Sequence, residues 1–201
     1  GLPYFSIRYK RFRVEGLAAG LVLFKNDNSV FGLLLKPRFY AVKSSFPDDG
    51  ELNGIDTTHR TVFAGVSYQY QHALFQVAAN ALKDVGGESD GTEANLTVSR
   101  GFNWGDFTIA PSLGLVWQDG RLVEHFYGVA DDETAPGRPA YGEHSSLNYQ
   151  AALTGIWTPG KHWHLLAVVK EDYLGEGITD SPIIDERSLT SVAVGAVFYF
   201  W

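Results

Sequence analysis

The sequence predicts an all-β protein: a transmembrane antiparallel up-and-down β-barrel of about 10 strands, within a range of 10–12. Apolar and polar residues alternate with a period of two, aromatic residues gather at the ends of the alternating segments, and short connections alternate with long ones. The longest apolar run, residues 192–201, is too short for a spanning helix, which needs about 18 residues or more. A membrane-spanning form of this chain would therefore cross as strands.

Alternation is clearest in residues 146–157 and 107–118, where one face is apolar and the other is small or polar. The segments predicted as strands are residues 3–9, 11–24, 30–42, 58–70, 73–85, 92–102, 107–118, 146–157, 163–174 and 189–201. The side chains expected to face lipid include Phe107, Leu113, Leu115, Leu147, Tyr149, Leu153, Val192 and Val194. Those expected to face inward include Lys36, Arg38, Ser112, Asn148 and Gln150. No segment of comparable length carries a 3.6-residue stripe, so we predict no long helix.

The connections divide into two groups. Residues 26–28, 71–72, 103–105 and 159–161 form short turns, whereas residues 43–57, 86–91, 119–144 and 175–187 form long loops rich in acidic residues. Short periplasmic turns and long extracellular loops are typical of outer-membrane barrels. With no linker or low-complexity stretch, we expect residues 1–201 to form a single barrel domain.

Composition narrows the partners and the compartment. A formal net charge of −7 argues against nucleic acid, and the absence of cysteine is compatible with an oxidising compartment. No signal peptide opens the sequence, and we expect one to have been removed before insertion into the bacterial outer membrane. We expect the lipid bilayer and lipopolysaccharide to be its surroundings. The acidic external loops serve solubility or, alternatively, divalent-cation bridging to lipopolysaccharide phosphates.

Half of the 16 Lys and Arg residues lie before Ser44, and alternation turns most of them inward. The predicted lumenal charge network consists of Arg8, Arg13, Glu15, Lys36, Arg38, Arg60, Lys170 and Asp172. We predict that Glu15 and Asp172 each pair with at least one of these cations, because unpaired charges in a narrow lumen carry a desolvation cost. The network would then close the bore as a plug; the alternative is an anion-selective constriction.

No constellation in the sequence predicts catalysis, and we expect no enzyme and no cofactor. His162 and His164 share a strand face, but no third ligand is near in sequence, so we predict no metal site. The segment Asp180-Ser181-Pro182 lacks the features of a nucleophile elbow, and we expect it to be structural, with its Asp and Ser bonding local amides.

Several short motifs recur in a fixed order along the chain. They are Phe126-Tyr127-Gly128-Val129, then Tyr141, then Asp180-Ser181-Pro182, preceded by Leu2-Pro3, Arg11-Phe12, residues 52–56 and Arg60. This set resembles the MipA/OmpV family of Gram-negative outer-membrane proteins. The pattern Gly195, Phe198 and Phe200 resembles the outer-membrane assembly signal, with Trp201 as one extra residue where the family usually ends in Phe. Family members carry a stretch before the Leu-Pro element, so we expect the amino-terminal portion to be incomplete.

The resemblance implies that the protein functions by binding other proteins. The family's named member is a scaffold that brings a murein-degrading transglycosylase together with a murein synthase, and other members are described as antigens and permeability factors. We therefore expect a non-enzymatic scaffold or adaptor with periplasmic murein hydrolase and synthase partners. The alternative is a narrow, porin-like channel for small, anionic solutes.

Overall fold

The computed structural model describes residues 6–38 and 61–198, which form one antiparallel sheet of twelve strands. The strands are β1 (Ser6–Tyr9), β2 (Phe12–Glu15), β3 (Ala18–Lys25), β4 (Ser29–Arg38), β5 (Thr61–Gln71), β6 (Gln76–Asp84), β7 (Thr92–Ser99), β8 (Phe102–Trp104), β9 (Phe107–Gln118), β10 (Ser146–Trp157), β11 (Trp163–Tyr173) and β12 (Ser188–Phe198). Each strand pairs with the next along the chain, except that β7 pairs with β9 and β8 forms a small hairpin with β9. The predicted all-β, up-and-down class is confirmed.

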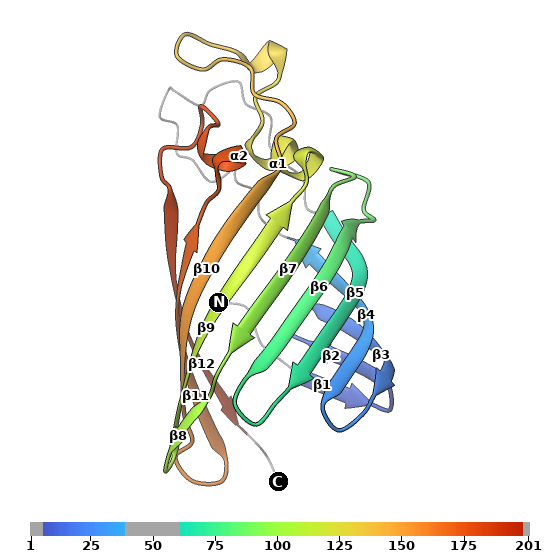
Figure 1. The fold of residues 1–201 in the computed structure, drawn as a ribbon, viewed down its shortest axis with the longest axis vertical. Coiled ribbons are helices and arrows are strands. Elements are labelled where there is room, and N and C mark those ends of the chain that lie inside the picture. Colours follow the sequence, from blue (N-terminus) through green and yellow to red (C-terminus); the bar gives the residue numbers. More distant parts are fainter. Residues whose placement is uncertain (1–5, 39–60, 199–201) are drawn as a thin grey trace.

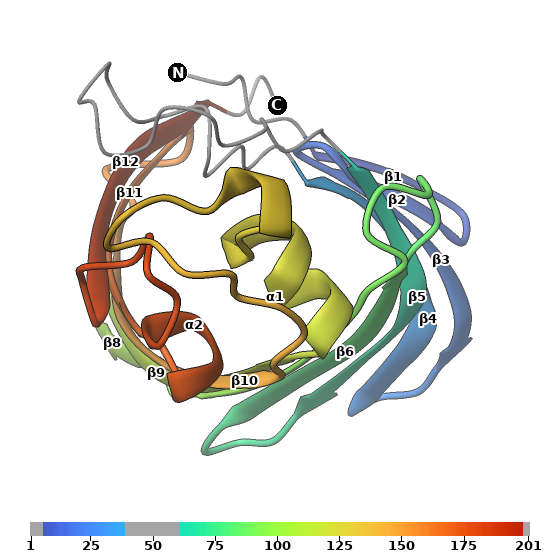
Figure 2. The ribbon, with the colours of Figure 1, turned by 90° about the horizontal axis from the view of Figure 1, so that it is seen from above.

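The sheet curls strongly around a central axis, so that its concave face encloses helix α1 (Gly120–Tyr127) (Figure 2). Strands β1 and β12 are the two ends of the described sheet, and no pairing joins them within residues 6–38 and 61–198. No helix of the described chain is long and apolar enough to cross a membrane.

The alternation correctly predicts which side chains face each way. The eight residues expected to face lipid all lie exposed on the convex face, from Leu115 at 39% to Val194 at 82%. On the opposite face, Asn148 is buried and Gln150 and Ser112 are partly buried. Because the apolar side chains point out and the polar ones point in, the sheet has the faces of a membrane barrel rather than of a soluble sandwich.

Two predicted strands were wrong in detail. Residues 11–24 are not one strand, because a tight turn at Gly16 (φ +58°) folds them into β2 and β3. Glycine adopts this left-handed conformation without steric cost, which permits the two-residue reversal. Residues 92–102 are also divided, since β7 ends at Ser99 and β8 begins at Phe102.

The two ends of the sheet differ as the connections predict. The four predicted short turns lie at one end, and the long loops carry α1, the short helix η1 (Asp131–Glu133) and helix α2 (Glu176–Thr179) at the other (Figure 1). Aromatic rings gather at the short-turn end, where Phe107 stacks on Trp157 at 5.6 Å and Trp163 packs edge-on against Phe198 at 4.9 Å. Such rings suit a membrane–water boundary.

Candidate functional site

The candidate site is the loop-end mouth of the curved sheet, which the chain fills with its own loops. The loop between β9 and β10 begins with α1, whose first turn is capped by Asp119: its Oδ1 accepts a hydrogen bond from the Leu122 amide at 3.0 Å. Leu122, Val123 and Phe126 follow at helical spacing and form a single apolar stripe, with 0%, 0% and 1% exposure. The helix therefore turns its apolar face into the mouth.

The wall of the sheet supplies matching apolar residues. Phe63 of β5 and Leu82 of β6 are each 2% exposed and form one cluster with Leu122 and Phe126, which we call the mouth cluster. The loop between β6 and β7 approaches as closely: a Cβ placed on Gly91 would lie 2.7 Å from the Cβ of Leu122. The only sizeable apolar core in the described chain thus lies inside the mouth, between a loop and the wall.

A buried ion pair lies beneath the mouth cluster. The Arg38 Nη1 of β4 is 2.6 Å from the Glu93 Oε2 of β7, and the two side chains are 15% and 11% exposed. The same guanidinium lies 4.8 Å from the ring centroid of Phe126 and 5.6 Å from that of Phe63. The charge pair therefore connects the wall to the underside of α1.

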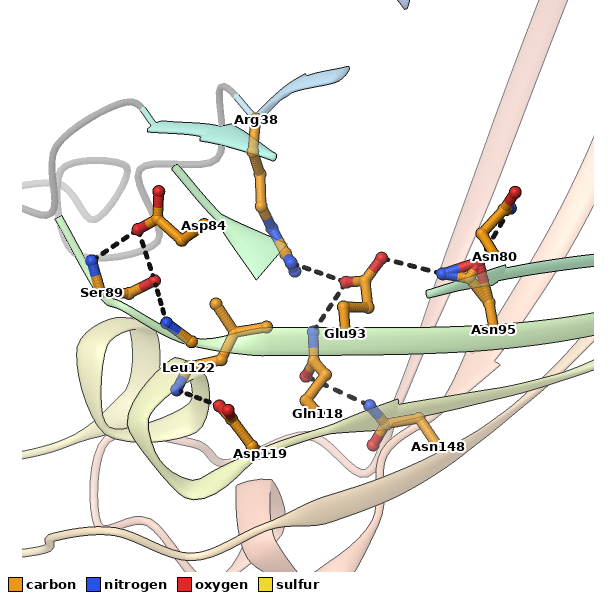
Figure 3. Close-up of polar contacts among 11 residues, drawn as sticks. Arg38, Asn80, Asp84, Ser89, Glu93, Asn95, Gln118, Asp119, Leu122 and Asn148 are labelled. Carbon is orange, nitrogen blue, oxygen red and sulfur yellow. Dashed lines mark hydrogen bonds and ion pairs between the residues drawn. The ribbon is translucent and has the colours of Figure 1, made fainter. Parts of the chain in front are cut away.

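Amide side chains extend this pair across four strands (Figure 3). Gln118 of β9 donates to Glu93 at 3.3 Å, and Asn95 donates to the other Glu93 oxygen at 2.9 Å. Asn148 of β10 donates to Gln118 at 3.4 Å and accepts from the Gly175 amide at 2.8 Å, which brings in the loop between β11 and β12. These contacts satisfy groups that burial would otherwise penalise.

Asp84, at the end of β6, organises the neighbouring loop. Its carboxylate accepts hydrogen bonds from Thr61 Oγ1 and from the Gly86 amide at 2.8 Å. It also accepts hydrogen bonds from both the amide and the hydroxyl of Ser89 at 2.7 Å (Figure 3). These bonds fold residues 85–91 inward, which places Gly91 against α1.

Three of the motifs that carry the family resemblance, residues 126–129, Tyr141 and residues 180–182, lie close together in space. Val129 and Tyr141 form a two-way backbone bridge with both hydrogen bonds at 2.9 Å. Ser181 Oγ donates to the Tyr127 carbonyl at 2.5 Å, and Tyr141 donates its hydroxyl proton to the Gly177 carbonyl at 3.1 Å. Contacts between residues 36 and 54 positions apart in the chain therefore hold the two longest described loops together.

The expectation for Asp180-Ser181-Pro182 was that its polar groups bond local amides. Ser181 accepts a 3.5 Å hydrogen bond from the Ile183 amide, but it is also buried and bonded to the distant Tyr127. Burial, together with the nearby negative charge of Asp180, raises the pKa of the Tyr141 phenol above its ordinary value. Residues 180–182 thus join the loop between β11 and β12 to the loop between β9 and β10. We call the contacts of Ser181 with Tyr127 and of Tyr141 with Gly177 the clasp.

The predicted lumenal charges fall into separate groups. Lys170 Nζ lies 2.6 Å from Asp172, whose other oxygen accepts from Gln150 at 2.5 Å. Arg38 pairs instead with Glu93, which is not among the residues of the predicted network. Register places the Arg13 backbone opposite that of Arg8, and Arg13 and Glu15 line one depression.

The remaining predicted residues have mixed outcomes. Lys36 lies opposite Phe63 on the concave face and is exposed. The Arg8 side chain, Arg60, residues 52–56, Leu2-Pro3, Phe200 and Trp201 lie outside the described part of the structure. Gly195 and Phe198 are both exposed on β12. The pairing of Glu15 and a single network across the bore stay predictions.

Metal-ligating groups do not assemble in the part of the chain that the structure describes, since no three His, Asp or Glu side chains are placed to hold one ion. The His162 and Phe198 ring centroids lie 5.7 Å apart, and Trp163 packs edge-on against the same Phe198 ring. These contacts place His162 in the aromatic border of the short-turn end.

The sheet has an apolar convex face, a polar concave face and a mouth filled by its own loops. These features define the class of protein as an outer-membrane β-sheet protein. The family model described as "MltA-interacting protein MipA" matches residues 1–200, and the chain therefore belongs to the MipA family. It is 25% identical to YiaT of Escherichia coli strain K12, which is named as a putative outer membrane protein, over 99% of this chain and 81% of the relative.

Two further relatives agree. The MltA-interacting protein of Escherichia coli strain K12 is 22% identical over 99% of this chain and 81% of its own length. The outer membrane protein OmpV of Vibrio cholerae is 21% identical over 74% of this chain and 58% of its own length. No solved structure matches. The chain is thus an outer-membrane protein, as the sequence predicted.

Proposed function

We propose that this chain is a non-enzymatic scaffold of the outer membrane that binds murein-processing enzymes at its short-turn, periplasmic face. One observation carries the proposal: α1 occupies the loop-end mouth and buries Leu122, Val123 and Phe126 there. A mouth filled by an apolar stripe and a buried ion pair favours a blocked bore over an open pore. An outer-membrane protein with a blocked bore acts by binding other proteins.

Family membership supports the kind of partner. A relative that is matched over 81% of its own length is named for its interaction with MltA, and the matching family model carries the same description. We infer that this chain likewise binds a murein hydrolase, and that a murein synthase is a second partner. The short turns present exposed residues, including Trp104 and Lys161, on the side where such enzymes work.

The partner proposal can be tested by site-specific photo-crosslinking, because the sequence has no cysteine. One variant carries Lys161→Cys in the turn between β10 and β11, and its matched control carries Ala135→Cys in the loop of the opposite end; both positions are exposed. Each is labelled with a photoreactive maleimide in membranes containing an MltA-type hydrolase. We expect the hydrolase to crosslink to position 161 and not to position 135. Crosslinks at neither position, or at position 135 alone, would exclude periplasmic docking.

The second candidate function is a narrow channel for anionic solutes. It is favoured by the polar concave face, where Lys36, Arg38 and Lys170 place positive charge. Conduction would require α1 to leave the mouth, which exposes three fully buried apolar side chains to water. The two functions are therefore separated by whether the wild-type protein conducts.

A further inference from the structure

Arg100 is a cation on the lipid-facing side of the sheet, between the end of β7 and the start of β8. The strand register is the same on both sides of this break, because Ser99 pairs with Ser112 and Phe102 pairs with Ile109. Side chains therefore continue to alternate across the break as they do along an unbroken strand. Arg100 thus shares the convex face with Phe102 and with Ile109, which is 39% exposed.

The surroundings of Arg100 on the convex face are apolar. The Arg100 amide donates a 3.1 Å hydrogen bond to the carbonyl of Pro111, which lies opposite on β9, and Val98 precedes Arg100 on the same face. Val98 is 44% exposed, and Pro111 is also exposed. No carboxylate within residues 6–38 and 61–198 forms an ion pair with Arg100. A cation among lipid-facing residues is costly without a counter-charge, so its counter-ion comes from outside this part of the chain.

Two stacked rings hold the guanidinium toward the short-turn end. The Arg100 Cζ lies 4.9 Å from the ring centroid of Phe102, which is two residues nearer to that end, and the Phe102 ring stacks on Trp104 at 6.0 Å. Trp104 is 60% exposed and belongs to β8, at the short-turn end of the sheet (Figure 1). Two residues of a strand tilted by about 40° span roughly 5 Å of depth. The charge therefore lies close to the aromatic level that marks the membrane boundary.

We propose that Arg100, Phe102 and Trp104 form a binding site for the phosphate group of a phospholipid in the periplasmic leaflet. The planar guanidinium donates to two oxygens of one phosphate, whose negative charge is the counter-ion of Arg100. The stacked rings pack against the glycerol backbone and the first methylene groups of the acyl chains. Because the site lies on the outer surface of the sheet, it is independent of the scaffold function and of the state of the mouth.

The test is a lipid titration of the detergent-solubilised protein followed by native mass spectrometry. Phosphatidylglycerol is compared with diacylglycerol of the same acyl chains, which lacks the phosphate, and we expect the wild type to bind phosphatidylglycerol more tightly. Arg100→Gln should lower the affinity for phosphatidylglycerol roughly fivefold and leave the affinity for diacylglycerol unchanged. The matched control Lys83→Gln removes an exposed charge from the convex face at the loop end of β6 and should keep wild-type affinity.

Two results would overturn the proposal: equal affinity of the wild type for the two lipids, or the same loss of affinity in Arg100→Gln and in Lys83→Gln. Displacement of the lipid by glycerol phosphate at equal concentration would also overturn it, because the site would then recognise free phosphate. A dimer that dissociates in Arg100→Gln would instead assign Arg100 to a contact with a second copy. Electrophoretic mobility with and without heating reports the folding of each variant. If Arg100→Gln does not fold, Phe102→Leu removes the ring beneath the guanidinium, with an expected loss of roughly two- to fivefold.

Discussion

The Phe126→Ala variant tests how firmly α1 closes the mouth. The Phe126 ring is 1% exposed, packs in the mouth cluster and faces the Arg38 guanidinium at 4.8 Å. Removing a buried Phe side chain costs about 3–5 kcal/mol, from lost burial and the cavity left behind. Because the loop can separate while the strands stay paired, this free energy acts on local opening of the mouth. The open fraction should rise by roughly two to four orders of magnitude.

Amide hydrogen exchange measures this opening directly. In Phe126→Ala, exchange should accelerate in α1 and remain unchanged in β9 and β10, which flank the loop. The control is Arg121→Ala on the exposed side of the same helix, where the side chain is 60% exposed and its Nε lies 4.0 Å from the Glu143 carboxylate. It should exchange like the wild type. Unchanged exchange in α1 of Phe126→Ala, or equal acceleration in α1 and both strands, would refute local closure by the mouth cluster.

Three further predictions concern the ion pair, the lipid-facing surface and the clasp. Glu93→Ala removes the carboxylate that pairs with the largely buried Arg38 guanidinium and should lower the free energy of unfolding in detergent by about 3–5 kcal/mol; a urea midpoint equal to wild type would count against it. Leu153→Arg places a charge on the lipid-facing surface and should cost about 2–4 kcal/mol near the midplane when measured by folding into liposomes, and a cost near zero would mean that Leu153 does not face lipid. The folded-state pKa of Tyr141 is raised, so its contribution to loop stability is full below its unfolded pKa of about 10 and is lost as pH rises through the folded value. Protease sensitivity of the loop between β9 and β10 should accordingly rise above about pH 10 in the wild type but show no such step in Tyr141→Phe.

Alternation was sufficient to predict the sheet, because lipid on one side and a polar interior on the other impose opposite demands on successive residues. It placed Leu113 and Val194 outward and Asn148 inward correctly. It did not find the break at Gly16, since a two-residue turn interrupts the alternation too briefly to register as a boundary.

The loop helix was missed for a different reason. Residues 120–127 form only two turns, and Leu122, Val123 and Phe126 are few enough to pass as scattered apolar residues in an acidic loop. Asp119 as a capping residue before that spacing was the signal available in the sequence. What the stripe packs against depends on Phe63 and Leu82, which are distant in the chain.

The charged site was half predicted. Alternation turned Arg38 inward, and the same rule applied to β7 would have turned Glu93 inward as well, with Asn95 two residues on. Which cation meets which carboxylate is decided by strand register and depth in the bore. A period of two carries no information about either.

Ionic conductance of the wild-type protein in planar bilayers is the most direct test of the closed-scaffold account. With α1 held in the mouth by its buried stripe and by the Arg38–Glu93 pair, the account predicts no stable opening, and Phe126→Ala should then produce openings that Arg121→Ala does not. Reproducible, anion-biased current steps from the wild type would contradict closure and favour the channel.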